Sequence, residues 1–207
     1  MRGDLLQVLF FAILAGFLIY RLFSALGRRE GFEREEGPFE EEEISFEPAS
    51  KPGDEYVDPR LREPVTHIKT YDPRFRLDDF LEGARAAFRM IVEAYAKEDL
   101  KTLKSLLNLE LYRDFEEAIR DREVRKETLE TKIISLDLPI PTNAMVHQKK
   151  AQIRVKITSE QQHIRRNEAG KIIEGDPKQT EQITDLWTFE KDLISSDPNW
   201  TLIKIES

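Results

Sequence analysis

The residue best placed for chemistry is Asp185, which precedes Trp187 by two positions and Phe189 by four. In a β-strand, side chains at this spacing point to the same face. A carboxylate in apolar surroundings has a raised pKa and can act as a general base. The simpler interpretation is a structural aspartate that reaches solvent or a backbone donor. We favour it because perturbed carboxylates are weak indicators of catalysis, and no catalytic tyrosine or histidine accompanies Asp185.

Other common signatures of catalysis are absent from the sequence. The histidines His67, His147 and His163 have no mutual spacing suited to a metal ion. The sequence contains no cysteine, which excludes disulfides, thiolate metal sites and a cysteine nucleophile. It also lacks a phosphate-binding loop, a dinucleotide fingerprint and a serine elbow. We therefore expect a binding protein and not an enzyme, with no metal and no cofactor.

The formal net charge of the chain is −8. Nucleic-acid binders usually carry a basic face, and none stands out here, so we do not expect a nucleic-acid partner. Most of the negative charge lies in residues 27–63, which contain 13 acidic and 6 basic residues. The acidity therefore belongs to one segment and not to the chain as a whole.

The apolar run that begins at Leu5 is the first element that could position a folded domain. A helix over Asp4–Leu26 would span about 34 Å, enough for the roughly 30 Å hydrocarbon core of a bilayer. A cleaved signal peptide would need net positive charge before the run and a good small-residue cleavage site after it, and both are missing. We therefore predict a retained transmembrane anchor over residues 1–26. Arg28 and Arg29 follow it, which predicts an outer N-terminus and a cytoplasmic C-terminal domain at the inner membrane.

Residues 27–76 have the composition of a tether. A glutamate-rich run over Glu33–Glu47 is followed by several prolines. Such a segment cannot bury enough apolar surface to offset the entropy of ordering, so we predict an acidic, disordered linker. The Glu40–Glu43 cluster could dock on a basic partner, because apolar side chains are interspersed with the glutamates: Phe32, Phe39, Ile44 and Phe46. We favour a solvated spacer, which is what blocks of like charge usually form.

Residues 77–207 carry the patterns of a folded α+β domain. Apolar residues at three- and four-residue spacing predict a helix over 77–97, and shorter stretches predict helices over 100–107 and 111–126. The period then changes to two, which predicts strands over 129–138, 151–164, 183–193 and 200–205. We therefore expect about three helices packed on the apolar face of a four-stranded antiparallel meander.

Four stretches of this domain stand out as motifs: FLEGARAAF at 80–88, EGDP at 174–177, TDLWTFE at 184–190 and DPNW at 197–200. Together they resemble the domain of the Tim44-like family, which is named for a subunit of a mitochondrial inner-membrane translocase. The resemblance covers roughly the last two thirds of the chain, and the anchor and acidic linker resemble the bacterial members. It implies a cone-like fold, related to nuclear transport factor two and cystatin, with a hydrophobic pocket between sheet and helices.

The resemblance also implies a function. The expected role is an adaptor that binds a partner protein at the membrane, in protein translocation, membrane-protein assembly or chaperone recruitment, with anionic lipid as a further contact. The mitochondrial relatives bind chaperone and channel largely through a long charged N-terminal region, which this chain replaces with an anchor and a tether. Two alternatives stay open: a carrier of lipid or another small apolar ligand, and an isomerase-like enzyme that uses Asp185.

Two sets of residues are candidates for binding. The first would line the implied pocket, or would simply form the core, as aromatic residues at strand period usually do: Phe88, Ile91, Tyr95, Phe115, Asp185, Trp187 and Phe189. The second would form a basic patch that faces a membrane or a partner, or an ordinary solvated helix face: Arg74, Arg76, Arg85 and Arg89.

Overall fold

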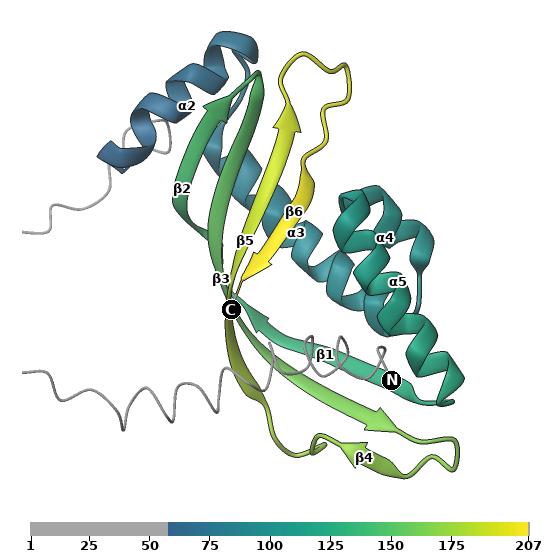
Figure 1. Ribbon diagram of the computed structural model, residues 1–207. Helices are drawn as coiled ribbons and strands as arrows, with labels where there is room; N and C mark the ends of the chain where they lie inside the picture. Colours follow the sequence, from purple (N-terminus) through teal and green to yellow (C-terminus); the bar gives the residue numbers. More distant parts are fainter. Residues whose placement is uncertain (1–57, 207) are drawn as a thin grey trace, which may run out of the picture.

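The computed structural model describes residues 58–206, which form four helices and six strands (Figure 1). The helices are α2 (Pro59–Tyr71), α3 (Leu77–Ala96), α4 (Leu100–Leu106) and α5 (Leu109–Val124). The strands are β1 (Thr128–Leu136), β2 (Ile140–His147), β3 (Lys150–Arg166), β4 (Ile172–Glu174), β5 (Glu181–Asp192) and β6 (Thr201–Glu206). The predicted anchor and the acidic part of the predicted linker lie outside these residues. Within residues 58–206, no helix is both long and apolar enough to cross a bilayer.

The six strands form one antiparallel sheet around the long strand β3. β5 pairs along one edge of β3, and β6 extends the sheet beyond β5. The opposite edge of β3 is shared, because β2 pairs with its first half and β1 with its second half. β3 bends between these halves, and the sheet curves with it (Figure 1).

The predicted α+β class and the antiparallel sheet are confirmed, but the described sheet has six strands instead of four and is not a simple meander. The sequence pattern does not reveal β2, because Pro139 and Pro141 flank its start and its buried positions do not alternate. β2 joins β3 through Gln148 and Lys149, whose φ angles of 50° and 65° are those of a tight hairpin turn. β4 has three residues, too few for a period to be recognised.

Helix α2 corrects the predicted boundary between linker and domain. It lies inside the segment 27–76 that we expected to be disordered, so the folded domain begins near Asp58 and not at Leu77. The Asp58 side chain caps the helix by accepting a hydrogen bond of 2.9 Å from the backbone N–H of Arg60. Pro59 occupies the first helical position, where its missing N–H leaves no bond unmade.

The apolar stripe of α2 explains why the helix belongs to the domain. Leu61, Val65 and Ile68 recur at four- and three-residue spacing, and all three are buried in the hydrophobic core. The prolines around the stripe, including Pro64 inside the helix, give the segment the composition of a linker. The spacing of the apolar residues within 59–71 therefore predicts a helix, whereas the proline-rich composition of the same segment predicts a linker.

The core lies between the helices and the inner face of the sheet. α3 carries the predicted amphipathic stripe, and its first turn contains Asp78 and Asp79, whose carboxylates suit the positive end of the helix dipole. β3 alternates as predicted, with Ile153, Val155 and Ile157 fully buried. In chain order α3 follows α2 and precedes α4, so one end of α3 lies beside α2 and the other beside α4.

Candidate functional site

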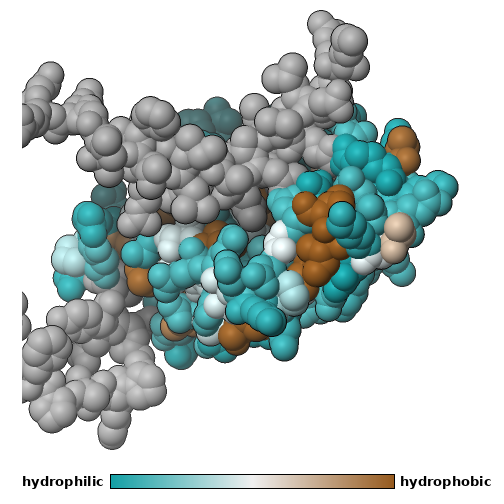
Figure 2. All heavy atoms as spheres, turned by 90° about the horizontal axis from the view of Figure 1, so that it is seen from below, coloured by the Kyte–Doolittle hydropathy of each residue, from teal (hydrophilic) through white to brown (hydrophobic). Residues whose placement is uncertain are grey.

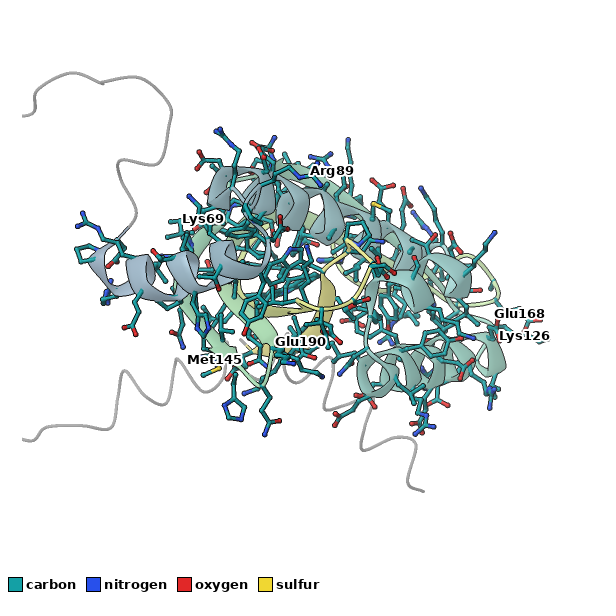
Figure 3. All side chains as sticks on the ribbon, turned by 90° about the horizontal axis from the view of Figure 1, so that it is seen from above. Lys69, Arg89, Lys126, Met145, Glu168 and Glu190 are labelled. Atoms are coloured by element: carbon teal, nitrogen blue, oxygen red, sulfur yellow. The ribbon has the colours of Figure 1, made fainter. Side chains whose placement is uncertain are left out.

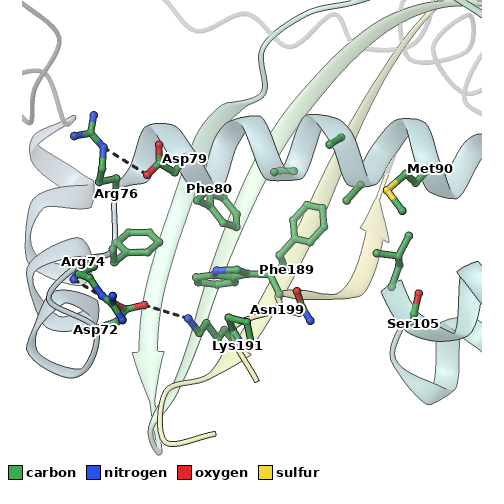
Figure 4. Close-up of a pocket in the computed structure, with 18 residues that line it drawn as sticks. Asp72, Arg74, Arg76, Asp79, Phe80, Met90, Ser105, Phe189, Lys191 and Asn199 are labelled. Atoms are coloured by element: carbon green, nitrogen blue, oxygen red, sulfur yellow. Dashed lines mark hydrogen bonds and ion pairs between the residues drawn. The ribbon is translucent and has the colours of Figure 1, made fainter. Parts of the chain in front are cut away.

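A groove of about 550 Å³ lies between α3, the α2–α3 loop and the loop that joins β5 to β6 (Figure 4). α3 lines it with Gly83, Ala86 and Ala87, and then with Met90. A Cβ atom built on Gly83 would meet nothing within 4 Å, so this side of the helix is open. Because these side chains are small, an occupant of the groove can approach the helix backbone closely.

The floor of the groove is aromatic. The ring centroid of Trp200 lies 4.7 Å from that of Phe80 and 6.0 Å from that of Phe75. Phe80 in turn contacts Phe189 edge to face, at 5.9 Å between centroids. Trp200 is half-buried and Met90 is 48% exposed, so apolar surface remains in contact with solvent. Ring contacts at these separations are favourable and stabilise the aromatic floor of the groove.

Charged side chains form the rim of the groove (Figure 4). The Lys191 ammonium donates to Asp72 at 3.2 Å, which ties β5 to the C-terminal end of α2. The Arg76 guanidinium lies 3.6 Å from the Asp79 carboxylate. Arg74 is exposed at the same rim, and its guanidinium forms no ion pair with any other residue of 58–206. A free guanidinium presents a fork of donors suited to a carboxylate or a phosphate.

The predicted pocket residues lie mostly in the interior and not at this groove. Phe189 lines the groove from β5. The other six are buried in the core or beside it: Phe88, Ile91, Tyr95, Phe115, Asp185 and Trp187. The ring centroids of Phe88 and Trp187 lie 4.8 Å apart, and those of Tyr95 and Phe115 lie 5.3 Å apart. These aromatic side chains therefore pack against one another.

Tyr95 also has a buried cationic neighbour that the sequence does not reveal. The Arg122 side chain is 2% exposed, and its guanidinium carbon lies 4.8 Å from the centroid of the Tyr95 ring. The Arg122 guanidinium also donates to the Tyr95 carbonyl at 2.8 Å and to the Glu98 carboxylate at 3.3 Å. Burial raises the pKa of the Tyr95 hydroxyl, although Arg122 and other arginines act in the opposite direction. This cluster joins α5 to the end of α3.

Asp185 occupies the position on β5 that its spacing predicts. It is 8% exposed and buried together with Trp187 and Phe189, opposite Ile157 of β3. A buried hydrogen bond of 2.8 Å joins Gln161 to Ser159 on the neighbouring part of β3, so this section of the sheet is more polar than the rest. Among residues 58–206, no group of three histidine or acidic side chains is arranged to hold a metal ion.

The four predicted arginines do not form one surface. Arg74 and Arg76 lie at the groove. Arg85 and Arg89 are not among the residues that line the groove, and at about 100° per residue they lie on the flank of α3 beyond Ala86. Arg85 pairs with Glu82 at 3.2 Å, and Arg89 points outward from the helix layer (Figure 3). The first two arginines are therefore the ones that can contact an occupant of the groove.

A second hollow lies at the start of α5, beside the ends of β3 and β5. Its wall includes Glu190, which accepts hydrogen bonds from Lys150 at 2.7 Å and from Gln152 at 2.8 Å. Burial raises the pKa of Glu190, but these two donors outweigh burial and hold the pKa below its usual value. Glu190 and Lys150 thus satisfy each other, whereas burial and the neighbouring Glu110 raise the pKa of Asp114 on the same wall. No aromatic side chain lines this hollow, which makes it a weaker candidate than the groove beside α3.

Sequence reasoning missed most of the groove. The Asp-Pro-Asn-Trp motif marks the turn that carries Trp200, but the rest of the groove comes from Phe75 and Asp72, which follow the unpredicted helix α2.

Figure 2 shows the molecule from below, where the coloured surface is mainly hydrophilic and apolar side chains gather in small, separate patches.

The half-buried His163 predicts how stability depends on pH. Its Nδ1 lies 3.0 Å from the Thr131 hydroxyl, and burial lowers its pKa below the usual 6.5, although Glu181 and Glu174 act in the opposite direction. The unfolded chain therefore takes up this proton more readily, so the stability contributed by neutral His163 is complete above about pH 6.5 and falls below it. We expect His163→Gln to lose less stability than the parent protein between about pH 7 and pH 5 in urea unfolding.

The exposed Thr66 provides a control without an ionisable side chain. Thr66→Ala should leave the pH dependence of the parent protein unchanged. If His163→Gln and the parent protein lose the same free energy of unfolding over this interval, His163 does not contribute to the acid sensitivity.

The sequence matches a protein-family model over residues 61–207, described as the Tim44-like domain. The match begins inside α2, in agreement with the corrected boundary. No protein of curated function matches the chain. Among solved structures, it resembles a crystal structure of the intermembrane space region of the chloroplast protein ARC6, with 12% identity and a TM-score of 0.46. That likeness covers 64% of this chain and 97% of the other, and at this level it carries no argument about function.

Proposed function

This chain belongs to the Tim44-like domain family, and from that premise we propose that it is a membrane-tethered adaptor whose groove beside α3 binds a segment of a partner protein. Tim44-like domains are generally non-catalytic binding domains. The groove carries the proposal, since it combines an aromatic floor, a small-residue helix face and a charged rim. Peptide-binding grooves use the same combination, with apolar pockets for anchor side chains and a few polar groups that fix orientation.

A carrier of lipid or another small apolar ligand is the second candidate. A carrier would surround an acyl chain, and the positions predicted to line such a cavity hold packed rings, as between Phe88 and Trp187. The groove instead runs along the surface, where Met90 is 48% exposed. These observations favour a peptide segment as the occupant.

The membrane part of the proposal rests on the sequence. The apolar run that begins at Leu5 would anchor the chain, and Arg28 and Arg29 favour a cytoplasmic domain at the inner membrane. An anchored domain stays at high local concentration near the bilayer, so weak contacts with a partner suffice. The proposed partner is a protein of a translocation, assembly or chaperone system, with anionic lipid as a secondary contact.

Photo-crosslinking in intact membranes tests the proposal. A photoreactive amino acid in place of Met90 would sit in the groove of the full-length protein, and the same replacement at Val124 provides the control. Val124 is 78% exposed at the end of α5, away from the groove. We expect Met90 to yield a discrete protein adduct that Val124 does not. Identical adduct patterns from both positions, or lipid adducts alone at Met90, would contradict the adaptor function.

A further inference from the structure

A segment of the same chain has the chemistry that the groove would recognise. Residues 38–47, the acidic segment, read PFEEEEISFE and thus combine three large apolar side chains with five glutamates. The segment lies outside the described residues. Neither the tether nor the adaptor function explains why phenylalanines are interspersed with these glutamates.

The apolar side chains of the acidic segment match the floor of the groove. The rings of Phe75, Phe80 and Trp200 form the aromatic floor, and the small side chains of α3 leave the opposite side open. A phenyl ring can lie against this floor in an offset or edge-to-face arrangement, as those rings already do with each other. Anchor side chains of this kind usually dominate the affinity of a peptide.

The charges of the rim favour an acidic occupant. The carboxylates of Asp72 and Asp79 are engaged by Lys191 and Arg76 respectively. Among the three cations that line the groove, Arg74 is therefore the one without an ionic partner within residues 58–206. A glutamate of the acidic segment would supply that partner in a charge-assisted hydrogen bond.

The chain is long enough for the acidic segment to reach its own groove. α2 has 13 residues, so it spans about 20 Å, and its C-terminal cap Asp72 lines the groove. Residues 48–57 connect the segment to Asp58, and ten residues extend to at most about 35 Å. The connection therefore exceeds the length of the helix that it must pass.

We propose that the acidic segment, residues 38–47, docks intramolecularly in the groove beside α3, with Phe39 or Phe46 on the aromatic floor and a glutamate on Arg74. This inference rests on the proposed use of the groove as a peptide-binding surface. The docked segment competes with a partner for the groove. Because the segment is covalently attached, its effective concentration at the groove is on the order of millimolar. A partner must therefore bind the groove tightly enough to displace the attached segment.

Disulfide trapping in the full-length protein tests the docking, and the natural absence of cysteine leaves no background. Ser45→Cys is combined with Ala86→Cys, which lies in the groove, or with Val124→Cys, which lies at the end of α5 away from the groove. We expect the Ser45–Ala86 pair to form an intramolecular disulfide at least about tenfold faster than the Ser45–Val124 pair under mild oxidation. Arg74→Glu should slow that reaction severalfold, as should replacing Phe39 and Phe46 together by serine.

The outcomes separate the proposal from its rivals. Equal rates for the two cysteine pairs would overturn the docking, and disulfide-linked dimers as the main product would mean that the groove takes the segment of a second copy. If the cysteine pairs react equally while Met90 still yields a protein adduct, the docking fails and the adaptor function stands. If docking occurs, deletion of residues 38–47 should increase the yield of that adduct, because the competitor has been removed.

Discussion

Ile68→Ala is expected to reduce the free energy of unfolding of the domain by about 2–5 kcal/mol. Ile68 is 1% exposed and belongs to the hydrophobic core, where it packs from α2. Removing its methylene and methyl groups loses their transfer free energy and leaves a cavity that the surrounding side chains only partly fill. Urea unfolding of residues 58–207, which contain the complete described core, would measure the change.

The matched control is Glu63→Ala on the exposed side of the same helix. It should change the free energy of unfolding by less than about 0.5 kcal/mol, as surface substitutions usually do. The comparison separates two views of residues 59–71. A disordered linker would tolerate both substitutions equally, and equal small effects would show that α2 does not contribute to the stability of the domain.

Gly175→Ala is expected to destabilise the domain by about 2–4 kcal/mol, whereas Gly170→Ala should cost about 1 kcal/mol. Both glycines have positive φ, +84° at Gly175 and +74° at Gly170, so both substitutions strain the backbone. They differ in space, because a Cβ on Gly175 would overlap the backbone carbonyl oxygen of His163, whereas one on Gly170 would meet nothing within 4 Å. The first substitution must therefore also displace β4 from β3.

Urea unfolding of the two variants, with amide hydrogen exchange along the β3–β4 pairing, would check this difference. Faster exchange near Arg166, which pairs with Ile172, is expected in Gly175→Ala and not in Gly170→Ala. Equal losses of stability in the two variants would mean that the close approach of Gly175 to β3 is not important in solution.

Local periodicity was enough to predict most of the elements behind the groove. The stripe of α3 and the alternation of Ile153, Val155 and Ile157 each follow from one buried face, and the structure confirms both. α2 was not predicted because prolines gave the segment the composition of a linker, although Leu61, Val65 and Ile68 keep helical spacing. Periodicity should therefore be examined even where proline and charge suggest disorder.

The groove could not be predicted from the sequence for a different reason. Its floor joins Phe75, which follows α2, to Trp200, which precedes β6, and the two residues are 125 positions apart in the chain. No spacing rule relates such residues, because their proximity depends on how α2 and the β5–β6 loop pack against α3. Phe88 follows the helical pattern of α3, and Trp187 follows the strand pattern of β5. Both are predicted to line a pocket, yet they pack against each other in the core.

The position of α2 has a mechanical consequence. The chain enters the described domain at Asp58, runs along α2 beside β2 and reaches the groove at Asp72. A pulling force between Asp58 and an occupant of the groove therefore follows the helix and loads its packing in shear. Phe189 and Lys191 of β5 also line the groove, so part of the force passes to β5 and to its pairing with β3. The load is therefore shared between the packing of α2 and the central strands of the sheet.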